Sequence, residues 1–164
     1  MAKAGSPRDC PCFSGKRYLA CCAPLHRGGD GGWQREAESP ALLMRSRYAA
    51  FALGLGPYLV HTLAADHEDL ALPRAELIRA LSEVRHRQRF MGLRILHEAD
   101  AGAEGEVMFY ARIFEKGVDA SFVELSRFVR EGIAWRYASG ILVPKADLPA
   151  DLETLTPADL RRRS

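Results

Sequence analysis

The sequence predicts an α+β fold in which helices pack on a curved antiparallel sheet, preceded by a small cysteine-rich knuckle. Three observations lead to this prediction. All four cysteines of the 164-residue chain lie within thirteen residues near its start. Apolar residues between positions 39 and 84 recur at helical spacing, and from Phe90 onward they alternate with the period of a strand. Helices followed by strands with short connections are typical of α+β domains.

The cysteines form two close pairs, Cys10 with Cys12 and Cys21 with Cys22, and eight residues separate the pairs. Two pairs joined by a short loop offer four sulfur ligands to one tetrahedral metal ion, for which zinc is the first expectation and iron an alternative. His26 is an alternative ligand in place of one cysteine. A disulfide framework is the competing interpretation. Adjacent cysteines bridge each other only with strain, and the chain shows no secretory signal.

Three helices are expected between residues 39 and 84. The first begins at Ser39-Pro40, with serine as N-cap and proline in the first turn, and it stops at Gly54. Pro57 opens a second, short helix that runs to about residue 64, and Pro73 opens a third. The apolar stripes are Met44, Tyr48, Phe51 and Leu55 in the first helix and Leu77, Leu81 and Val84 in the third.

Four strands are expected after Phe90. Turn signals at Ala101-Gly102, Lys116-Gly117 and Glu131-Gly132 separate them, and connections this short predict an antiparallel meander. The alternating segments are Met91 to His97, Val107 to Ile113, Phe122 to Arg130 and Ile133 to Tyr137. The pattern after Pro144 is weak and predicts at most a loose helix over residues 151–163.

The chain therefore divides into a knuckle over residues 8–28, an α+β domain over residues 38–144 and a C-terminal tail over residues 145–164. A glycine-rich stretch from Gly28 to Gly32 joins knuckle and body, so we expect them to be energetically separable. A net charge of +2 argues against a nucleic-acid surface, and no stretch approaches the eighteen apolar residues of a membrane span. Without a secretory signal, the expected location is the cytoplasm.

The cysteine run resembles the SEC-C motif, which occurs at the C-terminus of the SecA translocation motor and in many other bacterial proteins. Its pattern, C-P-C-G-S-G-K-x-Y-x-x-C-[CH], matches Cys10 to Cys22 except that Phe13 replaces a glycine, which the turn there would favour if it needs a positive φ. The resemblance implies zinc binding and a protein partner linked to translocation, folding or the ribosome. Lys16, Arg17 and Tyr18 are the candidate contacts for that partner.

The body is similar to the YchJ family, which joins an N-terminal SEC-C motif to a nuclear-transport-factor-2-like domain. The residues that carry the resemblance include Leu43 to Tyr48, Gly92 to Leu96, Glu124, Ser126 to Glu131, Trp135, Tyr137 and Gly140. The family implies a cone with a cavity between sheet and helices. Two departures predict a less polar cavity: Leu63-Ala64-Ala65 replaces the usual Trp-His-Pro, and Val123 replaces a frequent histidine.

Tyr48, Phe51 and Glu124 are the candidate cavity-lining residues. Glu124 and Arg127 lie three apart on a strand and so point to opposite faces, which excludes them as one catalytic pair. No Ser-His-Asp or Cys-His arrangement is visible in the sequence, so no catalytic residue is assigned and an enzyme is not the expected class.

Three hypotheses follow. The favoured one is a metal-stabilised protein-interaction module, because four sulfurs leave no open position on the metal for catalysis. The second is a small-molecule binder or enzyme that uses the cone cavity. The third is an RNA-binding accessory protein that uses Lys16, Arg17, Arg27 and the run Arg161 to Arg163.

Overall fold

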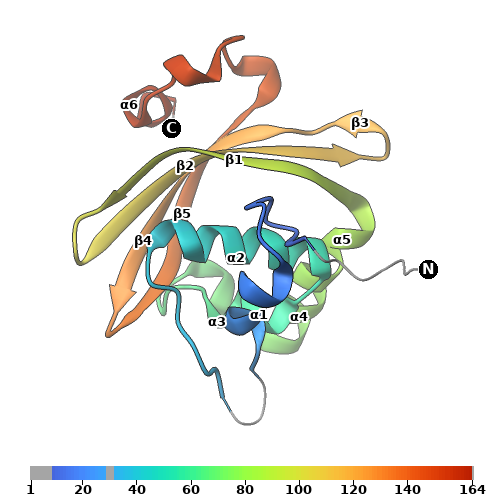
Figure 1. Cartoon of the computed structure of the whole chain (residues 1–164), viewed down its shortest axis with the longest axis vertical. Coiled ribbons are helices and arrows are strands. Elements are labelled where there is room, and N and C mark those ends of the chain that lie inside the picture. Colours follow the sequence, from blue (N-terminus) through green and yellow to red (C-terminus); the bar gives the residue numbers. More distant parts are fainter. Residues whose placement is uncertain (1–8, 29–31, 164) are drawn as a thin grey trace.

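The computed structural model of the chain describes residues 9–28 and 32–163. Residue 8 of the predicted knuckle, residues 29–31 of the predicted glycine linker and residue 164 of the tail lie outside them. The predicted α+β fold is confirmed: the helices before the first strand lie on one face of a curved antiparallel sheet, and the C-terminal segment lies on the other (Figure 1). Among the described residues, no helix is both long and apolar enough to span a membrane.

The described chain contains six α-helices and four short 3-10 helices. The α-helices are α1 (Ala23–His26), α2 (Pro40–Leu53), α3 (Gly56–His61), α4 (Arg74–Ser82), α5 (Val84–Arg87) and α6 (Pro157–Arg161). The 3-10 helices are Tyr18–Ala20, Glu68–Ala71, Lys145–Asp147 and Leu152–Thr154.

Helix α2 begins and ends where the sequence predicts. The Ser39 side chain accepts a hydrogen bond from the Leu42 amide at 3.1 Å, which satisfies one of the free N–H groups of the first turn. Pro40 follows in the first turn, and Gly54 ends the helix at φ 73° and ψ 38°. That left-handed conformation suits glycine because it has no Cβ.

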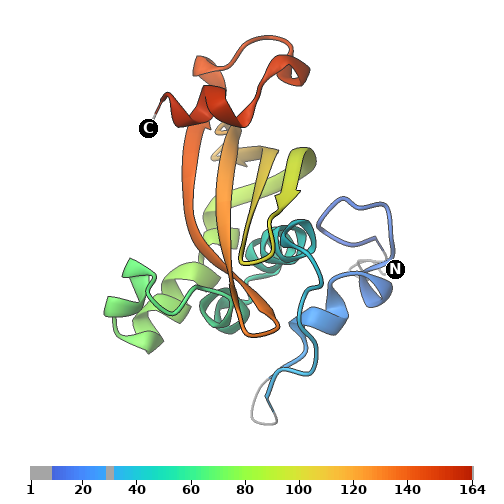
Figure 2. The same ribbon diagram turned by 90° about the vertical axis from the view of Figure 1, so that its left-hand side faces the viewer.

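Helix α2 is buried on more sides than its apolar stripe predicts. Met44 and Tyr48 face the sheet as expected, but Ser46, Arg47 and Ala49 are buried as well. The reason is that the knuckle and helix α4 lie on opposite sides of α2 (Figure 2). A helix enclosed in this way cannot show the one-sided polarity of a surface helix.

The sheet is an antiparallel meander of five strands, one more than predicted, in the order β1-β2-β4-β5 with β3 paired to β2. The strands are β1 (Gln88–Asp100), β2 (Glu104–Glu115), β3 (Val118–Asp119), β4 (Phe122–Glu131) and β5 (Ala134–Pro144). The three predicted turns contain Gly102, Gly117 and Gly132, all at positive φ. The extra strand, β3, has only two residues, too few for an alternating pattern.

Two features of the sheet differ from the expected alternation. Strand β1 shifts register between Phe90 and Gly92, and this bulge turns Met91 outward, where it is 39% exposed, while Phe90 packs inward. Strand β5 continues to Pro144 instead of ending at Tyr137, because its pairing with β4 resumes at Ser139 after a register shift that skips Ala138.

The C-terminal tail covers the outer face of the sheet. Helix α6 is short, but a capping box between Thr156 and Asp159 fixes its first turn. Its Leu160 is fully buried in a cluster with Met108, Val123, Leu125 and Val143 from three strands. The expected loose helix is therefore an anchored cover. Its three leucines, Leu152, Leu155 and Leu160, are divided between a 3-10 turn and α6, so they form no continuous helical stripe that would reveal it.

We expect Leu160→Ala to destabilise the protein by about 2–4 kcal/mol, because it removes a fully buried side chain and leaves a cavity under the tail. Urea unfolding measures the change. Leu142→Ala, at a position on strand β5 that is 52% exposed, is the matched control and is expected to stay within about 0.5 kcal/mol of the parent. Equal losses for the two variants would contradict the anchoring role of Leu160.

Candidate metal centre and cavity

The knuckle is a tight loop followed by a short helix. The Cys10 amide donates to the Lys16 carbonyl at 2.8 Å, and the Phe13 amide donates to the Cys10 carbonyl at 3.1 Å, which folds the first cysteine pair back on the loop. The second pair follows the 3-10 helix Tyr18–Ala20, and Cys22 is the N-cap of α1. The loop and the helix therefore bring the two pairs together.

The four cysteine sulfurs form one cluster, in which all of them lie within 4.8 Å of one another. Two separations are 3.6 Å, between Cys12 and Cys21, and 3.9 Å, between Cys21 and Cys22. Four sulfurs around one zinc ion at about 2.3 Å stand about 3.8 Å apart, so these separations fit a tetrahedral metal centre. A disulfide needs about 2.05 Å, and all four thiols are free.

The ionisation of these thiols also fits a metal-binding role. Hydrogen bonds from Cys10 and then Cys22 stabilise the Cys12 thiolate and hold its pKa far below its usual range. The hydrogen bond to Cys12 raises the pKa of Cys10 to about 11, and the hydrogen bond to Cys10 raises the pKa of Cys22 further. Without a cation the cluster therefore favours one thiolate among thiols, whereas a bound divalent cation would stabilise all four thiolates. The Ser14 hydroxyl, 3.2 Å from the Cys21 sulfur, adds one donor to this cluster.

His26 is not part of the candidate ligand cluster, which consists of the four cysteines. Its Nε2 donates to the Ser46 carbonyl at 2.8 Å, and its Nδ1 accepts from the Tyr18 hydroxyl at 2.7 Å. Burial lowers the pKa of His26, which favours the neutral ring that this pattern requires. Both ring nitrogens are thus engaged, and the four cysteines remain as the donor set.

Of the three residues expected to contact a partner, Lys16 and Arg17 are exposed, whereas Tyr18 is half-buried. Its hydroxyl bond to His26 places Tyr18 inside the packing of the knuckle. Two apolar side chains of the same segment, which the sequence pattern does not single out, are also exposed: Leu19 at 71% and Phe13 at 47%.

Phe13 occupies the position where the motif has glycine, and it does adopt a positive φ, at 60°. A side chain in this left-handed region is strained by contact between Cβ and the backbone. The Phe13 ring packs edge-on against Tyr48 of α2, with ring centroids 6.2 Å apart. That contact offsets part of the strain.

The knuckle packs directly against α2, which counts against its expected energetic independence from the body. Arg45 donates to the Cys12 carbonyl at 2.9 Å, and Ala49 is fully buried beneath the cysteine cluster. The His26 bond to Ser46 and the edge contact of its ring with Tyr58, at 4.8 Å between centroids, add a second attachment. The glycine-rich stretch predicts a flexible linker, but its composition carries no information about contacts between the knuckle before it and the body after it.

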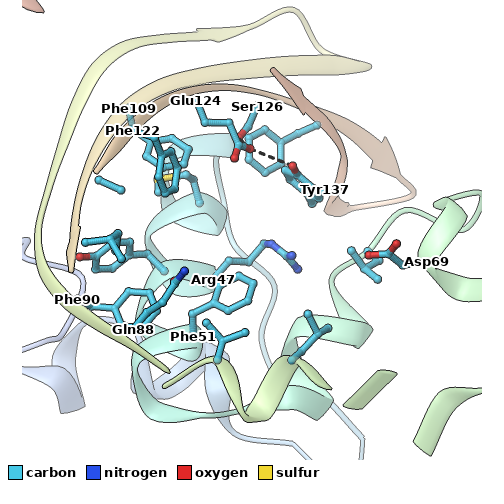
Figure 3. Close-up of a pocket in the computed structure, with 18 of the residues that line it drawn as sticks. Arg47, Phe51, Asp69, Gln88, Phe90, Phe109, Phe122, Glu124, Ser126 and Tyr137 are labelled. Atoms are coloured by element: carbon cyan, nitrogen blue, oxygen red, sulfur yellow. Dashed lines mark hydrogen bonds between the residues drawn. The ribbon is translucent and has the colours of Figure 1, made fainter. Parts of the chain in front are cut away.

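A cavity of about 390 Å³ lies between the inner face of the sheet and helices α2, α4 and α5 (Figure 3). Tyr48, Phe51 and Glu124 all line it, and Arg127 does not. Its wall is mainly aromatic and aliphatic. The Tyr48 hydroxyl is occupied, because it donates to the Gly92 carbonyl at 2.8 Å.

The Glu124 carboxyl sits on the cavity wall with two hydroxyl donors. Its Oε2 accepts from Ser126 at 2.6 Å and from Tyr137 at 2.9 Å (Figure 3). A Cβ at Gly140 would lie 2.3 Å from this oxygen, so the glycine leaves the space that the carboxyl occupies. Burial raises the pKa of Glu124 above its ordinary value of 4.5, although both hydrogen bonds and the charge of Arg47 act in the other direction.

The chain between knuckle and body contributes a polar cluster that sequence reasoning missed. Glu36 binds Arg136 of strand β5 through two bonds, at 2.8 and 3.2 Å, and lies 3.6 Å from His61 Nε2. Trp33 stacks on the His61 ring at 4.5 Å between centroids. The carboxylate partner of His61 lies 25 residues away along the chain, where helical spacing could not reveal it.

The C-terminal arginines are engaged within the chain. Arg161 binds Glu106 at 3.0 Å, Arg162 pairs with Asp159, and Arg163 donates to the Asp147 carbonyl at 2.7 Å. These contacts argue against a free basic patch at this end, on which the RNA-binding hypothesis partly depended.

Comparison with known proteins decides the family. The profile described as "YchJ, middle NTF2-like domain" matches residues 39–140. The chain is 36% identical over 133 residues to the UPF0225 protein YchJ of Shigella dysenteriae, a match that covers 80% of this chain and 81% of that protein. The chain belongs to the YchJ family. The domain match also confirms the nuclear-transport-factor-2-like fold that the resemblance implied.

Two solved structures are similar to this YchJ family member over most of its length. One is the solution structure of a SEC-C motif containing protein from Rhodopseudomonas palustris, with 37% identity, a TM-score of 0.67, and coverage of 80% of this chain and 96% of the other. The second is the crystal structure of a SEC-C motif containing protein from Psychrobacter arcticus, with 25% identity, a TM-score of 0.66 and 82% coverage of both chains. The SEC-C assignment of the cysteine run thus agrees with its structural relatives.

The two departures from the YchJ pattern have different consequences. Leu63 lines the cavity, where it adds apolar surface as expected. Val123 does not, because it is fully buried on the opposite face of strand β4, in the cluster with Leu160. The expectation that Val123 makes the cavity less polar is therefore wrong, since the strand alternation that turns Glu124 inward turns Val123 outward.

Removal of the metal is expected to destabilise the body as well as unfold the knuckle. Metal binding carries the folding of small zinc modules, worth about 10–16 kcal/mol apparent, and this knuckle covers Ala49 and binds Arg45. A strong chelator should lower the unfolding temperature of the whole protein while the strand signal in circular dichroism persists at low temperature, and added zinc should restore it. An unchanged temperature would show that knuckle and body are energetically separate.

The strain at Phe13 can be separated from its ring contact by two substitutions. Phe13→Ala loses the ring but keeps a Cβ at positive φ, whereas Phe13→Gly loses both ring and strain. We expect the glycine variant to be more stable than the alanine variant by about 1–2 kcal/mol, measured by urea unfolding of the metal-loaded proteins. Equal stabilities would mean that the turn is not strained.

The raised pKa of Glu124 predicts a pH dependence of stability. The folded protein holds a proton on Glu124 at pH values where the unfolded chain has lost it, so stability must fall as pH rises above 4.5 towards the folded pKa. Glu124→Gln removes this contribution. The wild type should therefore lose stability relative to the variant as pH is raised from 5 to 8. Comparing the two proteins at each pH cancels the effect of metal loss, and a constant difference would contradict the prediction.

Proposed function

We propose that the four cysteines bind one structural zinc ion and that the knuckle it stabilises docks a protein partner. The observation that supports the first part is the sulfur cluster itself, whose separations of 3.6 and 3.9 Å fit a tetrahedral centre. Thiolate sulfur is a preferred ligand for zinc and for iron among the metals that adopt this geometry.

A centre of this kind stabilises structure and does not catalyse a reaction. Four sulfurs fill all four positions of a tetrahedral ion, so no position remains for a substrate or an activated water. Cys10, Cys12 and Cys22 are also buried, with exposures of 4%, 0% and 0%. Four thiolates on a divalent ion carry a net negative charge, which Arg45, bonded to the Cys12 carbonyl, helps to offset.

The docking surface that we propose consists of Phe13, Lys16, Arg17 and Leu19, and we call it the knuckle tip. Leu19 is the more exposed of its two apolar side chains, at 71%, and the exposed cations Lys16 and Arg17 precede it in the chain by three and two residues. An apolar anchor with a basic rim fits a partner segment that is acidic and carries an apolar side chain. The translocation, folding and ribosome machineries implied by the SEC-C resemblance are the first source of partners to test.

The metal is tested by elemental analysis of protein purified without added metal. We expect about one zinc per chain and no visible absorption, whereas iron bound by four thiolates would absorb visible light. Substitution of Cys12 and Cys22 by serine should abolish binding. Protein that carries neither metal and cannot be loaded with either would refute this half of the proposal.

The partner is tested by photo-crosslinking from the knuckle tip in cells, comparing wild type with Leu19→Asp and Ile133→Asp. Ile133 is 81% exposed in the turn between β4 and β5, outside the knuckle tip, and serves as the matched control. We expect crosslinked proteins that disappear with Leu19→Asp and persist with Ile133→Asp at equal zinc content. The same pattern from both variants would refute a docking role for the tip.

A further inference from the structure

The cavity contains a buried cation with no counter-ion in contact. Arg47 of helix α2 is only 8% exposed, and it lines the cavity floor. Its Nη1 donates to the Leu59 carbonyl at 2.8 Å and to the Thr62 hydroxyl at 2.5 Å. No carboxylate of the described residues lies within ion-pair distance of it, and an arginine keeps its charge in a protein interior.

Only one of the three guanidinium nitrogens of Arg47, Nη1, is hydrogen-bonded among the described residues, which leaves Nε and Nη2 available. The bonds to Leu59 and Thr62 hold Nη1 at the C-terminal end of α3, and the guanidinium carbon lies 4.8 Å from the centre of the Tyr137 ring. In the described structure no hydrogen bond is made by Nε or Nη2. Figure 3 shows the guanidinium group of Arg47 directed into the open space between the sheet and the helices. The arginine is therefore held rigidly with free donors facing the cavity.

The two carboxyl groups on the cavity wall do not neutralise this charge. Glu124 has both hydroxyl partners on Oε2, and burial raises its pKa, which favours the neutral acid with a proton on Oε1. Asp69 stands at the mouth with its side chain 45% exposed, so water screens it. An unpaired buried charge is costly, and an anionic ligand would remove that cost.

Most of the rest of the wall is apolar, and its other polar side chains are His67, Arg87, Gln88 and Ser126. The aromatic residues that line the cavity are Phe51, Phe90, Phe109, Phe122 and Phe128, with Tyr48 and Tyr137. A volume of about 390 Å³ is within the range of small-molecule sites, in which an apolar wall surrounds a few polar groups that fix the orientation of the ligand.

We propose that this cavity binds a small organic carboxylate whose body is apolar, with the carboxylate on the free edge of Arg47 and the body among the phenylalanine rings. Two N–H groups of one guanidinium match the two oxygens of a carboxylate, and such charge-assisted pairs are strong in a site shielded from water. Oε1 of Glu124 carries no hydrogen bond in the described structure, and when the carboxyl is protonated there it offers a second donor to an oxygen of the ligand. This site is separate from the metal centre and does not depend on the proposed docking function.

Three probes of nearly equal shape test the proposal on the metal-loaded full chain by isothermal titration calorimetry. Phenylacetate carries the carboxylate, phenylacetamide is its neutral analogue, and phenethylamine carries a positive charge. We expect phenylacetate to bind at least tenfold more tightly than phenylacetamide and phenethylamine to bind least. Hexanoate tests whether an aliphatic body is also accepted. Equal binding of acid and amide, preference for the amine, or no binding of either carboxylate at millimolar concentration would overturn the proposal.

Variants assign the preference to Arg47. Arg47→Met should bring the ratio between acid and amide close to one, and Arg47→Lys should keep part of it because the charge remains. Arg127→Met, which removes a cation from the opposite face of strand β4, should change nothing. Ala111→Leu, which adds bulk at the cavity wall, should weaken both ligands alike even if Arg47→Met proves too unstable to measure. An unchanged ratio in a folded Arg47→Met protein, or unchanged affinities in Ala111→Leu, would overturn the assignment.

Discussion

The extensive burial of helix α2 is the constraint on which the rest of this structure depends. None of its residues is exposed, and each of its buried polar groups must find an internal partner. Ser46 does so by donating to the Leu43 carbonyl and bonding the Tyr58 hydroxyl, each at 2.7 Å. Arg47 does so only in part, through the last turn of α3. The knuckle is one of the covers that make α2 internal, which ties the cysteine cluster to the stability of the body.

The metal centre and the cavity consequently share one helix and one residue. The Tyr48 ring meets Phe13 of the knuckle on one side and Phe90 of the cavity wall on the other, with centroids 6.2 and 5.4 Å apart. Its hydroxyl binds the Gly92 carbonyl beside the bulge in strand β1. Tyr48 therefore links the knuckle to the cavity wall by direct packing, beside the knuckle's other contacts with α2.

Local signals in the sequence predicted the parts of the fold that local chemistry controls. The cap at Ser39, the left-handed Gly54 and the glycine turns between strands depend only on a few neighbouring residues. The spacing of the cysteines likewise depends on a single loop. The bulge that exposes Met91, the inward position of Arg47 and the contact between Glu36 and Arg136 depend on elements far away in the chain. Periodicity cannot report such contacts, because it describes which face a residue occupies and not what covers that face.

The polarity of the cavity also depends on contacts that a sequence pattern does not report. A comparison of the sequence with the YchJ family pattern treats Leu63 and Val123 as equivalent departures. Only Leu63 lines the cavity. With that position apolar, Arg47 is the most buried charged side chain of the lining, and its Nε and Nη2 and the Oε1 of Glu124 make no hydrogen bond in the described structure. The other charged or titratable lining residues, His67, Asp69 and Arg87, are more exposed. A charge acts most strongly where its surroundings are least polar. The loss of polar residues from the wall therefore strengthens the selectivity of the cavity for an anion, because less of the field of Arg47 is screened.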